Sequence, residues 1–289
     1  MKRAARLRAL LGSGRLVRAP GAYDALSARL IAQAGFDAVY MTGYGASASA
    51  IGAPDVGLLS MSEMARRASD IADAVDLPVI ADGDTGFGNP VNVRRTVREY
   101  EKAGVCGIQL EDQVAPKRCG HMLGREVVPA ADMVQKIKAA TDAREDRDFV
   151  IVARTDARTK HGLAEALQRG QAYREAGADA IFIESPESIE ELRMVAEAFP
   201  ATPTVANMVE GGRTPLLDAA ELEALGFALA IYPVGPLFAA ARAMTAYLSD
   251  LRGGAAHRSA AIGMTNFEEF NRLIGLPEYL DMQNRYRTE

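Results

Sequence analysis

The stretch QLEDQVAPKRCGHMLG brings together residue types that can move a proton. Its cysteine, Cys119, has one ionisable and two permanently charged neighbours: His121, Lys117 and Arg118. A thiol exchanges protons only when its thiolate is accessible near neutral pH, and nearby cations lower the pKa of a cysteine. Gly120 lets the backbone come close to a ligand. We predict that Cys119 is an acid–base residue; the alternative is an inert cysteine in a charged surface loop.

A second group of residues offers hard oxygen ligands. Asp82 and Asp84 are two residues apart in ADGDTGFGN, and two such residues lie on the same side of an extended segment. Carboxylates of this kind suit Mg²⁺ or Mn²⁺, held partly by water and partly by a substrate. Glu111, at the end of another apolar run, could reach the same ion through water. The alternative is an ordinary turn rich in Asp and Gly.

Other polar residues suit the binding of a small anion. Arg154, in VARTDAR, could grip a carboxylate with two parallel hydrogen bonds, and Asn207, in VANMVEGG, could donate to the same oxygens. The segment 42–45, TGYG, could form a small loop whose backbone N–H groups wrap an anion. Tyr40 lies on the same side of its segment as Thr42, although a core position is the commoner fate of a tyrosine.

These residues need a scaffold, and a recurrent pattern supplies one. The segments QAGFDAVYMTG, KAGVCGIQLED, EAGADAIFIES and ALGFALAIYPV each place a glycine between a helix end and a short apolar run. The runs LPVIADGD, DFVIVARTD, TPTVANMVEGG and GRLVRAPGAYD complete about eight strand candidates, with helical segments between them. Strands that alternate with helices imply a parallel sheet. Eight such units in this length favour a closed (β/α)8 barrel over an open doubly wound sheet.

The ends of the predicted strands support closure into a barrel. Polar residues follow six of the apolar runs: Thr42, Asp82, Glu111, Arg154, Glu184 and Asn207. Any one of them could be a helix N-cap, but six of different chemistry in one layer would converge on one mouth, where the catalytic groups of barrel enzymes gather.

The totals exclude several classes of protein. The chain has 289 residues, of which 48% are hydrophobic and 25% charged, and the net charge of −5 offers no basic field for nucleic acid. Two cysteines make no disulfide framework and fit a reducing cytoplasm. The basic N-terminus is interrupted by arginines, which favours an amphipathic helix over a secretion signal. No apolar run approaches the roughly 20 residues that cross a bilayer.

The end of the chain is predicted to be helical. The segment 236–254 reads as a helix closed by two glycines, and TNFEEFNRLIGL begins with a predicted capping box from Thr265 to Glu268. Three apolar residues follow at helical spacing: Phe267, Phe270 and Leu273. We therefore expect a barrel domain over residues 1–254 and a helical tail over 255–289. The apolar stripe could cover the chain's own barrel or that of a neighbouring subunit.

Four motifs together resemble the isocitrate lyase and phosphoenolpyruvate mutase superfamily: ADGDTGFGN, LEDQVAPKRCGH, ARTDAR and ANMVEGGRTP. The resemblance covers nearly the whole chain, and the lysine–arginine–cysteine–glycine–histidine motif is its most specific part. Within the superfamily the chain is similar to the small members, which are the 2,3-dimethylmalate lyases, petal death proteins, 2-methylisocitrate lyases and carboxyphosphonoenolpyruvate phosphonomutases. The resemblance implies a (β/α)8 barrel, Mg²⁺ and a homotetramer in which a C-terminal helix is exchanged between subunits.

The resemblance also implies roles for individual residues. It assigns Mg²⁺ and its waters to Asp82, Asp84 and Glu111. It assigns substrate binding to Thr42, Gly43, Tyr44, Gly120, Arg154, Glu184 and Asn207. It assigns catalysis to Cys119 with Lys117, Arg118 and His121, and Tyr40 is a candidate base.

The reaction that the resemblance implies is a retro-aldol cleavage of a 2-hydroxy dicarboxylate or tricarboxylate. The substrate types are a 2-alkylmalate, 2,3-dimethylmalate or 2-methylisocitrate, and the products are a 2-oxo acid such as pyruvate and a carboxylate whose carbanion Cys119 would protonate. Four segments, DGDTG, CGHMLGREVVPA, NMVEGGRTP and FEEFNRLIGL, together resemble the dimethylmalate lyase and petal death branch, and this resemblance implies a substituted malate rather than a tricarboxylate. A phosphonomutase is the first alternative, and a non-catalytic barrel that binds a ligand is the second.

Overall fold

A computed structural model describes residues 2–120, 124–254 and 263–287. Its eight strands are β1 (Val17–Ala22), β2 (Val39–Met41), β3 (Val79–Asp82), β4 (Gly107–Glu111), β5 (Val150–Thr155), β6 (Ala180–Ile183), β7 (Thr204–Asn207) and β8 (Leu229–Tyr232). All neighbours pair in parallel, and β1 pairs with β8, so that the sheet closes into a barrel. Every predicted strand is present, and the prediction of a closed (β/α)8 barrel is confirmed.

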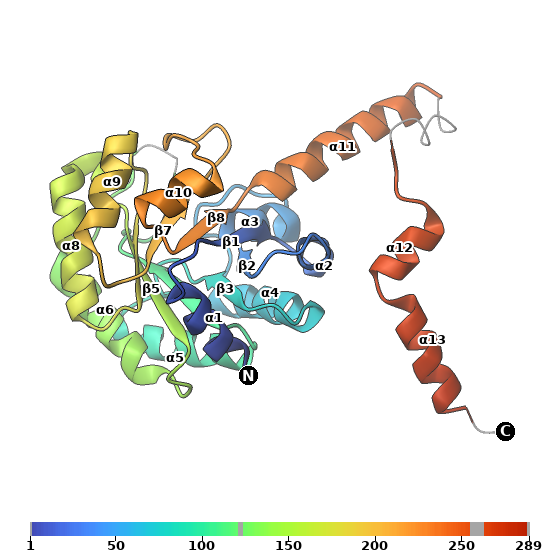
Figure 1. Ribbon diagram of the computed structural model, residues 1–289, viewed down its shortest axis with the longest axis horizontal. Helices are drawn as coiled ribbons and strands as arrows, with labels where there is room; N and C mark the ends of the chain where they lie inside the picture. The colour runs from blue at the N-terminus through green and yellow to red at the C-terminus, as the bar shows by residue number, and fades with distance from the viewer. Residues whose placement is uncertain (1, 121–123, 255–262, 288–289) are drawn as a thin grey trace. The chain divides into compact units, whose positions relative to one another are not determined.

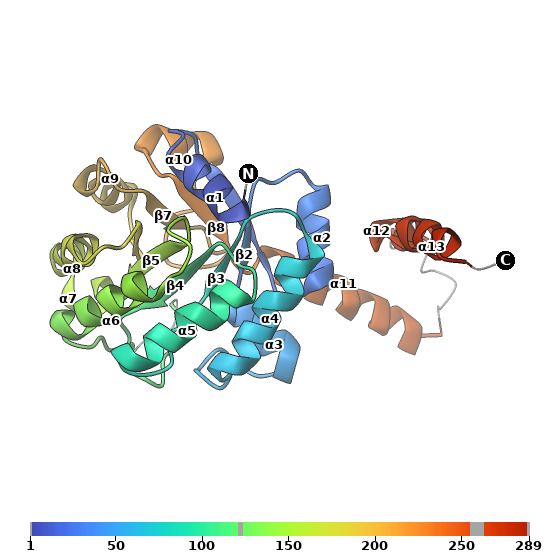
Figure 2. The same cartoon turned by 90° about the horizontal axis from the view of Figure 1, so that it is seen from below.

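Helices surround the strands, as Figures 1 and 2 show. Those of the barrel are α1 (Arg3–Leu11), α2 (Ala25–Gln33), α3 (Gly43–Ile51), α4 (Met61–Ala74), α5 (Pro90–Lys102), α6 (Ala130–Ala143), α7 (Arg158–His161), α8 (Leu163–Glu175), α9 (Ile189–Ala198) and α10 (Ala219–Leu225). Local signals explain their starts: Ser60 and Glu63 form the predicted capping box of α4, and Asn89 caps α5 ahead of Pro90. No described helix is long and apolar enough to cross a membrane.

Successive side chains of each strand point alternately into two apolar layers. One side of each strand packs against the helices, and the other fills the barrel with residues such as Ile80, Val152 and Phe182. The basic N-terminal segment forms α1, as predicted, and its Leu7 and Leu11 pack with residues at the N-terminal ends of the strands. That end of the barrel is therefore closed by apolar packing, and the opposite end is left for chemistry.

The contacts divide the chain into two compact units, residues 1–235 and 236–289. The second unit holds α11 (Gly235–Arg252) from its second residue onward, α12 (Phe267–Leu273) and α13 (Leu276–Arg285), and α11 ends before two glycines as expected. The predicted N-cap of α12 was wrong by one residue, because Asn266 caps this helix in a reciprocal pair with Glu269. The predicted domain boundary after residue 254 stays a prediction.

Candidate active site

The two aspartates of ADGDTGFGN meet at the C-terminal end of β3, although not by strand alternation. The strand ends at Asp82, and Asp84 has a positive φ of 46°, so the segment turns where an extended chain was expected. The turn is held because the Asp84 N–H donates to Asp82 Oδ1 at 3.0 Å. Gly43 N–H approaches the other Asp82 oxygen at 3.3 Å, and a Cβ at this glycine would lie 2.5 Å from it.

Glu111 lies beside this pair. Its N–H donates to the Asp84 carbonyl at 2.9 Å, which fastens the end of β4 to the turn after β3. The side chain is buried, and its Oε1 has no hydrogen-bond partner among the described residues. Burial raises the pKa of Glu111 well above its usual value, against the attraction of Arg154. Burial likewise raises the pKa of Asp84 to about 7.

Lys117 supplies a cation to this group of buried carboxylates and contacts two of them. Its Nζ lies 2.8 Å from Asp84 Oδ1 and 2.5 Å from Asp55 Oδ1, and all three side chains are buried. Burial opposes its charge, but the surrounding carboxylates prevail and raise the pKa of Lys117 well above its usual value. Asp55 was missed by the sequence reasoning, because its segment APDVG looks like any turn. Its carbonyl also accepts from the Cys119 N–H at 3.2 Å.

The residues at this place fit a small divalent cation. They offer carboxylate oxygens, one of them an unpartnered buried atom of Glu111, in a cluster with more acids than bases. Mg²⁺ typically binds through one or two carboxylates and keeps several waters. No described group of three or more His, Cys, Asp or Glu forms a ready-made ligand set. The assignment of Asp82, Asp84 and Glu111 to Mg²⁺ is therefore developed below as a proposal.

Arg154, the predicted carboxylate grip, faces the same mouth from β5. Two of its N–H groups, on Nε and Nη2, donate to the two Asp156 oxygens at 2.9 Å. Longer contacts of 3.4 and 3.3 Å join Nη1 to Glu111 and Nη2 to Glu184. The guanidinium also lies over the ring of Phe182. The structure thus brings Arg154 and Glu111 together, as the strand-end pattern predicted.

The neighbouring strands supply Glu184 and Asn207. The Asn207 Nδ2 approaches Glu184 Oε2 at 3.1 Å, and the Ser185 hydroxyl donates either to Glu184 Oε1 at 2.9 Å or to the Gly120 carbonyl at 3.1 Å. A Cβ at Gly120 would lie 2.4 Å from Arg154 Nη2 and 2.8 Å from the Glu184 carboxylate. The segment with the cysteine therefore lies directly against the predicted carboxylate-binding residues, and a glycine at 120 makes that approach possible.

The TGYG segment begins helix α3, where a small loop was expected. Thr42 is its N-cap and accepts from the Gly45 N–H at 3.2 Å, and the Gly43 N–H approaches Asp82 Oδ2 at 3.3 Å, so Thr42, Gly43 and Tyr44 lie beside the end of β3. Tyr40 lies inside the barrel, where its hydroxyl donates to Gln109 Oε1 at 2.9 Å. Burial raises the pKa of Tyr40 well above its usual value, and its role as a base stays a prediction.

The cysteine motif is described in part. Cys119 is half-buried, Arg118 is exposed, and the Gln113 amide holds the backbone N–H and carbonyl of Arg118 at 2.9 and 2.8 Å. His121 lies outside the described residues, so its predicted role stays a prediction. Lys117 directs its charge to Asp55 and Asp84.

Asp112 has a different task from its neighbour Glu111. It is fully buried and accepts hydrogen bonds from the Thr155 and Tyr173 hydroxyls, both at 2.7 Å, from the Asp156 N–H at 2.9 Å and from Arg169 at 3.1 Å. These contacts join β4, β5 and α8. Asp112 therefore supports the ends of the strands from behind and does not face Asp82 and Asp84.

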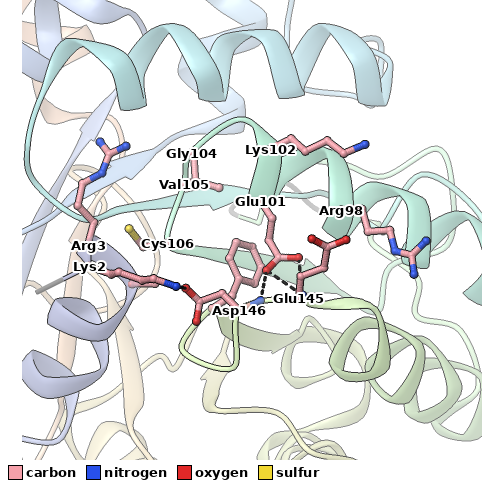
Figure 3. Close-up of a pocket in the computed structure, with 12 residues that line it drawn as sticks. Lys2, Arg3, Arg98, Glu101, Lys102, Gly104, Val105, Cys106, Glu145 and Asp146 are labelled. Carbon is pink, nitrogen blue, oxygen red and sulfur yellow. Dashed lines mark hydrogen bonds and ion pairs between the residues drawn. The ribbon is translucent and has the colours of Figure 1, made fainter.

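Two cavities lie at opposite ends of the barrel. One of about 540 Å³ opens beside the cluster and is lined by Asp84, Thr85 and Lys117, with residues from 57–62, 87–96 and 115–116. The other, of about 500 Å³, lies before β4 and β5 (Figure 3). There the Glu101 carboxylate accepts from the backbone N–H groups of Glu145 and Asp146, and Lys2 pairs with Asp146. These contacts hold loops, and the chemistry of barrel enzymes belongs to the other end.

Comparison with known proteins places this arrangement in a family. The family model of phosphoenolpyruvate phosphomutase matches residues 7–252. The chain is 57% identical over 288 residues to 2,3-dimethylmalate lyase of Eubacterium barkeri, covering 100% of this chain and 99% of that protein. It is 45% identical to the chloroplastic carboxyvinyl-carboxyphosphonate phosphorylmutase of Arabidopsis thaliana, over 94% of this chain and 81% of that protein.

The fold comparison agrees with the sequence comparison. A crystal structure of 2,3-dimethylmalate lyase, described as a PEP mutase/isocitrate lyase superfamily member, superimposes with a TM-score of 0.91. The two chains are 38% identical, and the match covers 99% of this chain and 95% of that one. The resemblance predicted from the four motifs is therefore confirmed.

Proposed function

This chain belongs to the PEP mutase/isocitrate lyase superfamily, and we propose from that premise that it cleaves the C2–C3 bond of a 2-alkylmalate such as 2,3-dimethylmalate. A carbon–carbon lyase is supported by the 57% identity to 2,3-dimethylmalate lyase, which extends over the entire chain. The observation that carries the proposal is one mouth in which buried carboxylates, Lys117, Arg154 and the Cys119 segment lie together.

Mg²⁺ is the cofactor that we propose for this mouth. Asp82 and Asp84 would hold the ion and its waters, and Glu111 would orient those waters. When bound, a divalent cation of this kind supplies positive charge where the 2-oxo group of the product develops. Burial raises the pKa of both Asp84 and Glu111. The bound ion would give these two carboxylates a positive partner in addition to Lys117 and Arg154.

The chain's own residues would divide the remaining work. Arg154 and Asn207 would bind a substrate carboxylate, and Thr42, Gly43 and Tyr44 at the start of α3 would contact it. Loss of the 2-hydroxyl proton allows the C2–C3 bond to break, and its electron pair stays on C3. We propose that Cys119 donates the proton that C3 then receives, and that Lys117 stays protonated and stabilises the negative charge nearby.

The assignment has a direct test. The protein would be incubated with Mg²⁺ and a panel of racemic 2-alkylmalates and 2-methylisocitrate, and the release of 2-oxo acid would be followed. We expect release from a substituted malate, loss of release in a chelator and a large loss in Cys119→Ser. Full activity of Cys119→Ser would show that Cys119 is not the proton donor. Rearrangement of a phosphonate without any 2-oxo acid release from the panel, followed by ³¹P NMR, would establish the mutase instead.

We also propose that the protein assembles as a homotetramer in the cytoplasm, with its C-terminal helices exchanged between subunits. Apolar side chains of the second unit support this, because Phe267, Tyr279 and Met282 are exposed in the single chain. Light scattering should give the mass of four chains, and a chain truncated after residue 254 should give a smaller assembly. A full-length protein with the mass of one chain would refute this part of the proposal.

A further inference from the structure

Arg154 uses its two edges differently, and the difference points to residues behind it. Nε and one N–H of Nη2 are bound to the two oxygens of Asp156, both at 2.9 Å. Among the described residues, the other edge, formed by Nη1 and the second N–H of Nη2, makes only the longer contacts with Glu111 and Glu184. A guanidinium binds a carboxylate best through two parallel N–H groups, and this second edge has that fork to offer.

Asp156 is itself fixed from three directions. Its N–H donates to Asp112 Oδ1 at 2.9 Å, and its Oδ1 accepts from Arg125 Nη1 as well as from Arg154. The Asp156 side chain is fully buried, and that of Arg125 is 1% exposed. Arg125 also donates through Nη2 to the Thr159 hydroxyl. Asp156 is therefore shared between two guanidinium groups, one of which belongs to the chain just after the cysteine motif.

The charges around Arg154 give Arg125 a purpose beyond geometry. Three buried carboxylates surround Arg154: Asp156, Glu111 and Glu184. Three carboxylates around one guanidinium give the group a net negative charge, which would repel an incoming anion because charges interact strongly where water is excluded. Arg125 adds a second positive charge at Asp156 Oδ1, the same oxygen that Arg154 Nη2 binds. It reduces the share of the Asp156 charge that neutralises Arg154 and leaves Arg154 more positive toward the mouth.

We propose that Arg125 and Asp156 are positioning residues for the substrate-binding arginine. Asp156 directs the open edge of Arg154 toward the mouth, and Arg125 keeps that edge attractive to a carboxylate. The inference rests on the proposed function, because it takes Arg154 to bind a substrate carboxylate. Neither residue touches the reacting atoms, so their loss acts on binding more than on the chemical step.

The test is binding of oxalate, a planar dianion that resembles a 2-oxo acid at its carboxyl end, to the Mg²⁺-loaded protein by calorimetry. We expect Arg125→Gln to weaken oxalate binding by about tenfold, the lower end of what loss of a supporting partner costs. KM for the substrate should rise by a similar factor with a smaller change in kcat. Arg125→Lys, which restores the charge but not the planar fork, should recover part of the loss. Arg158→Gln is the matched control, because it removes a fork-to-carboxylate pair with Glu191 outside the mouth.

The outcomes separate the two proposals. Equal oxalate affinity in the wild type, Arg125→Gln and Arg125→Lys would overturn the inference alone. An equal loss in Arg158→Gln would overturn it as well, since that effect would be one of general stability. If Arg125→Gln does not fold, Thr159→Val provides the same test, because it loosens Arg125 without removing charge, and an unchanged oxalate affinity there would overturn the inference. A wild-type protein that binds no oxalate with Mg²⁺ would overturn the proposed function, and the inference with it.

Discussion

A single added methyl group at Gly120 should disable the site while leaving the fold intact. In Gly120→Ala the new Cβ would lie 2.4 Å from Arg154 Nη2 and 2.8 Å from Glu184 Oε2, both of them buried and held by other contacts. An ordinary contact is about 3.4 Å, so the cysteine segment or Arg154 must move by about 1 Å. A misplacement of 1 Å can cost about 10²-fold in rate. That loss corresponds to about 2.7 kcal/mol of transition-state stabilisation.

The assay is kcat/KM for 2-oxo acid release with saturating Mg²⁺, together with the melting temperature. Gly12→Ala is the matched control, because its Cβ would meet no atom nearer than 3.4 Å and it lies at the end of α1. We expect Gly12→Ala to keep full activity and Gly120→Ala to lose about 10²-fold with a melting temperature within a few degrees of the wild type. A Gly120→Ala protein with activity within threefold of the wild type would show that the cysteine segment does not rest against Arg154 as described.

Three further predictions concern the buried charges. Lys117→Met should lower the free energy of unfolding, measured by urea titration in chelator at pH 8, by about 3 kcal/mol, because two buried carboxylates lose their cation. The double variant Lys117→Met/Asp55→Asn should recover part of this loss. The pKa of Asp84 is about 7 in the folded protein, above the ordinary value of 3.8, so the folded state binds this proton more tightly than the unfolded state. The free energy of unfolding of the metal-free protein, relative to that of Asp84→Asn, should therefore fall as the pH rises from about 4 to about 7. A difference that does not change with pH would contradict the raised pKa. Asp112→Asn should cost about 3 kcal/mol, because its amide would face the donors that now bind the carboxylate, and urea unfolding unchanged from the wild type would refute the supporting role.

The barrel could be predicted from the sequence because its signals are local. A glycine before four of the apolar runs and polar residues after six of them mark strand ends, and the structure places Asp82, Glu111 and Asn207 at the last position of their strands. The identity of the mouth residues followed from the same pattern. Helix starts were predictable where a cap and its partner were adjacent, and the error of one residue at Asn266 shows how similar neighbouring caps can be.

What the sequence could not predict depends on distance along the chain. Asp55 meets Lys117 from 62 positions away, and nothing in its own segment distinguishes it from a turn residue. The Asp156 contact with Arg125 is of the same kind. The segment from Asp82 to Asp84 was predicted to be extended, because alternation is the default for residues two apart. In the structure Asp84 has a positive φ, and Gly83 lies so close to β4 that a Cβ there would meet Ile108.

The central claim is that a divalent cation and the Cys119 thiol lie on opposite sides of one small anion. The most direct measurement is a crystal structure of the protein with Mg²⁺ and oxalate. We expect the cation beside Asp82 and Asp84, the oxalate against Arg154, and the sulfur of Cys119 directed at the anion from the other side. Acidic residues without a cation, and a thiol directed into solvent while oxalate is bound elsewhere, would contradict the account.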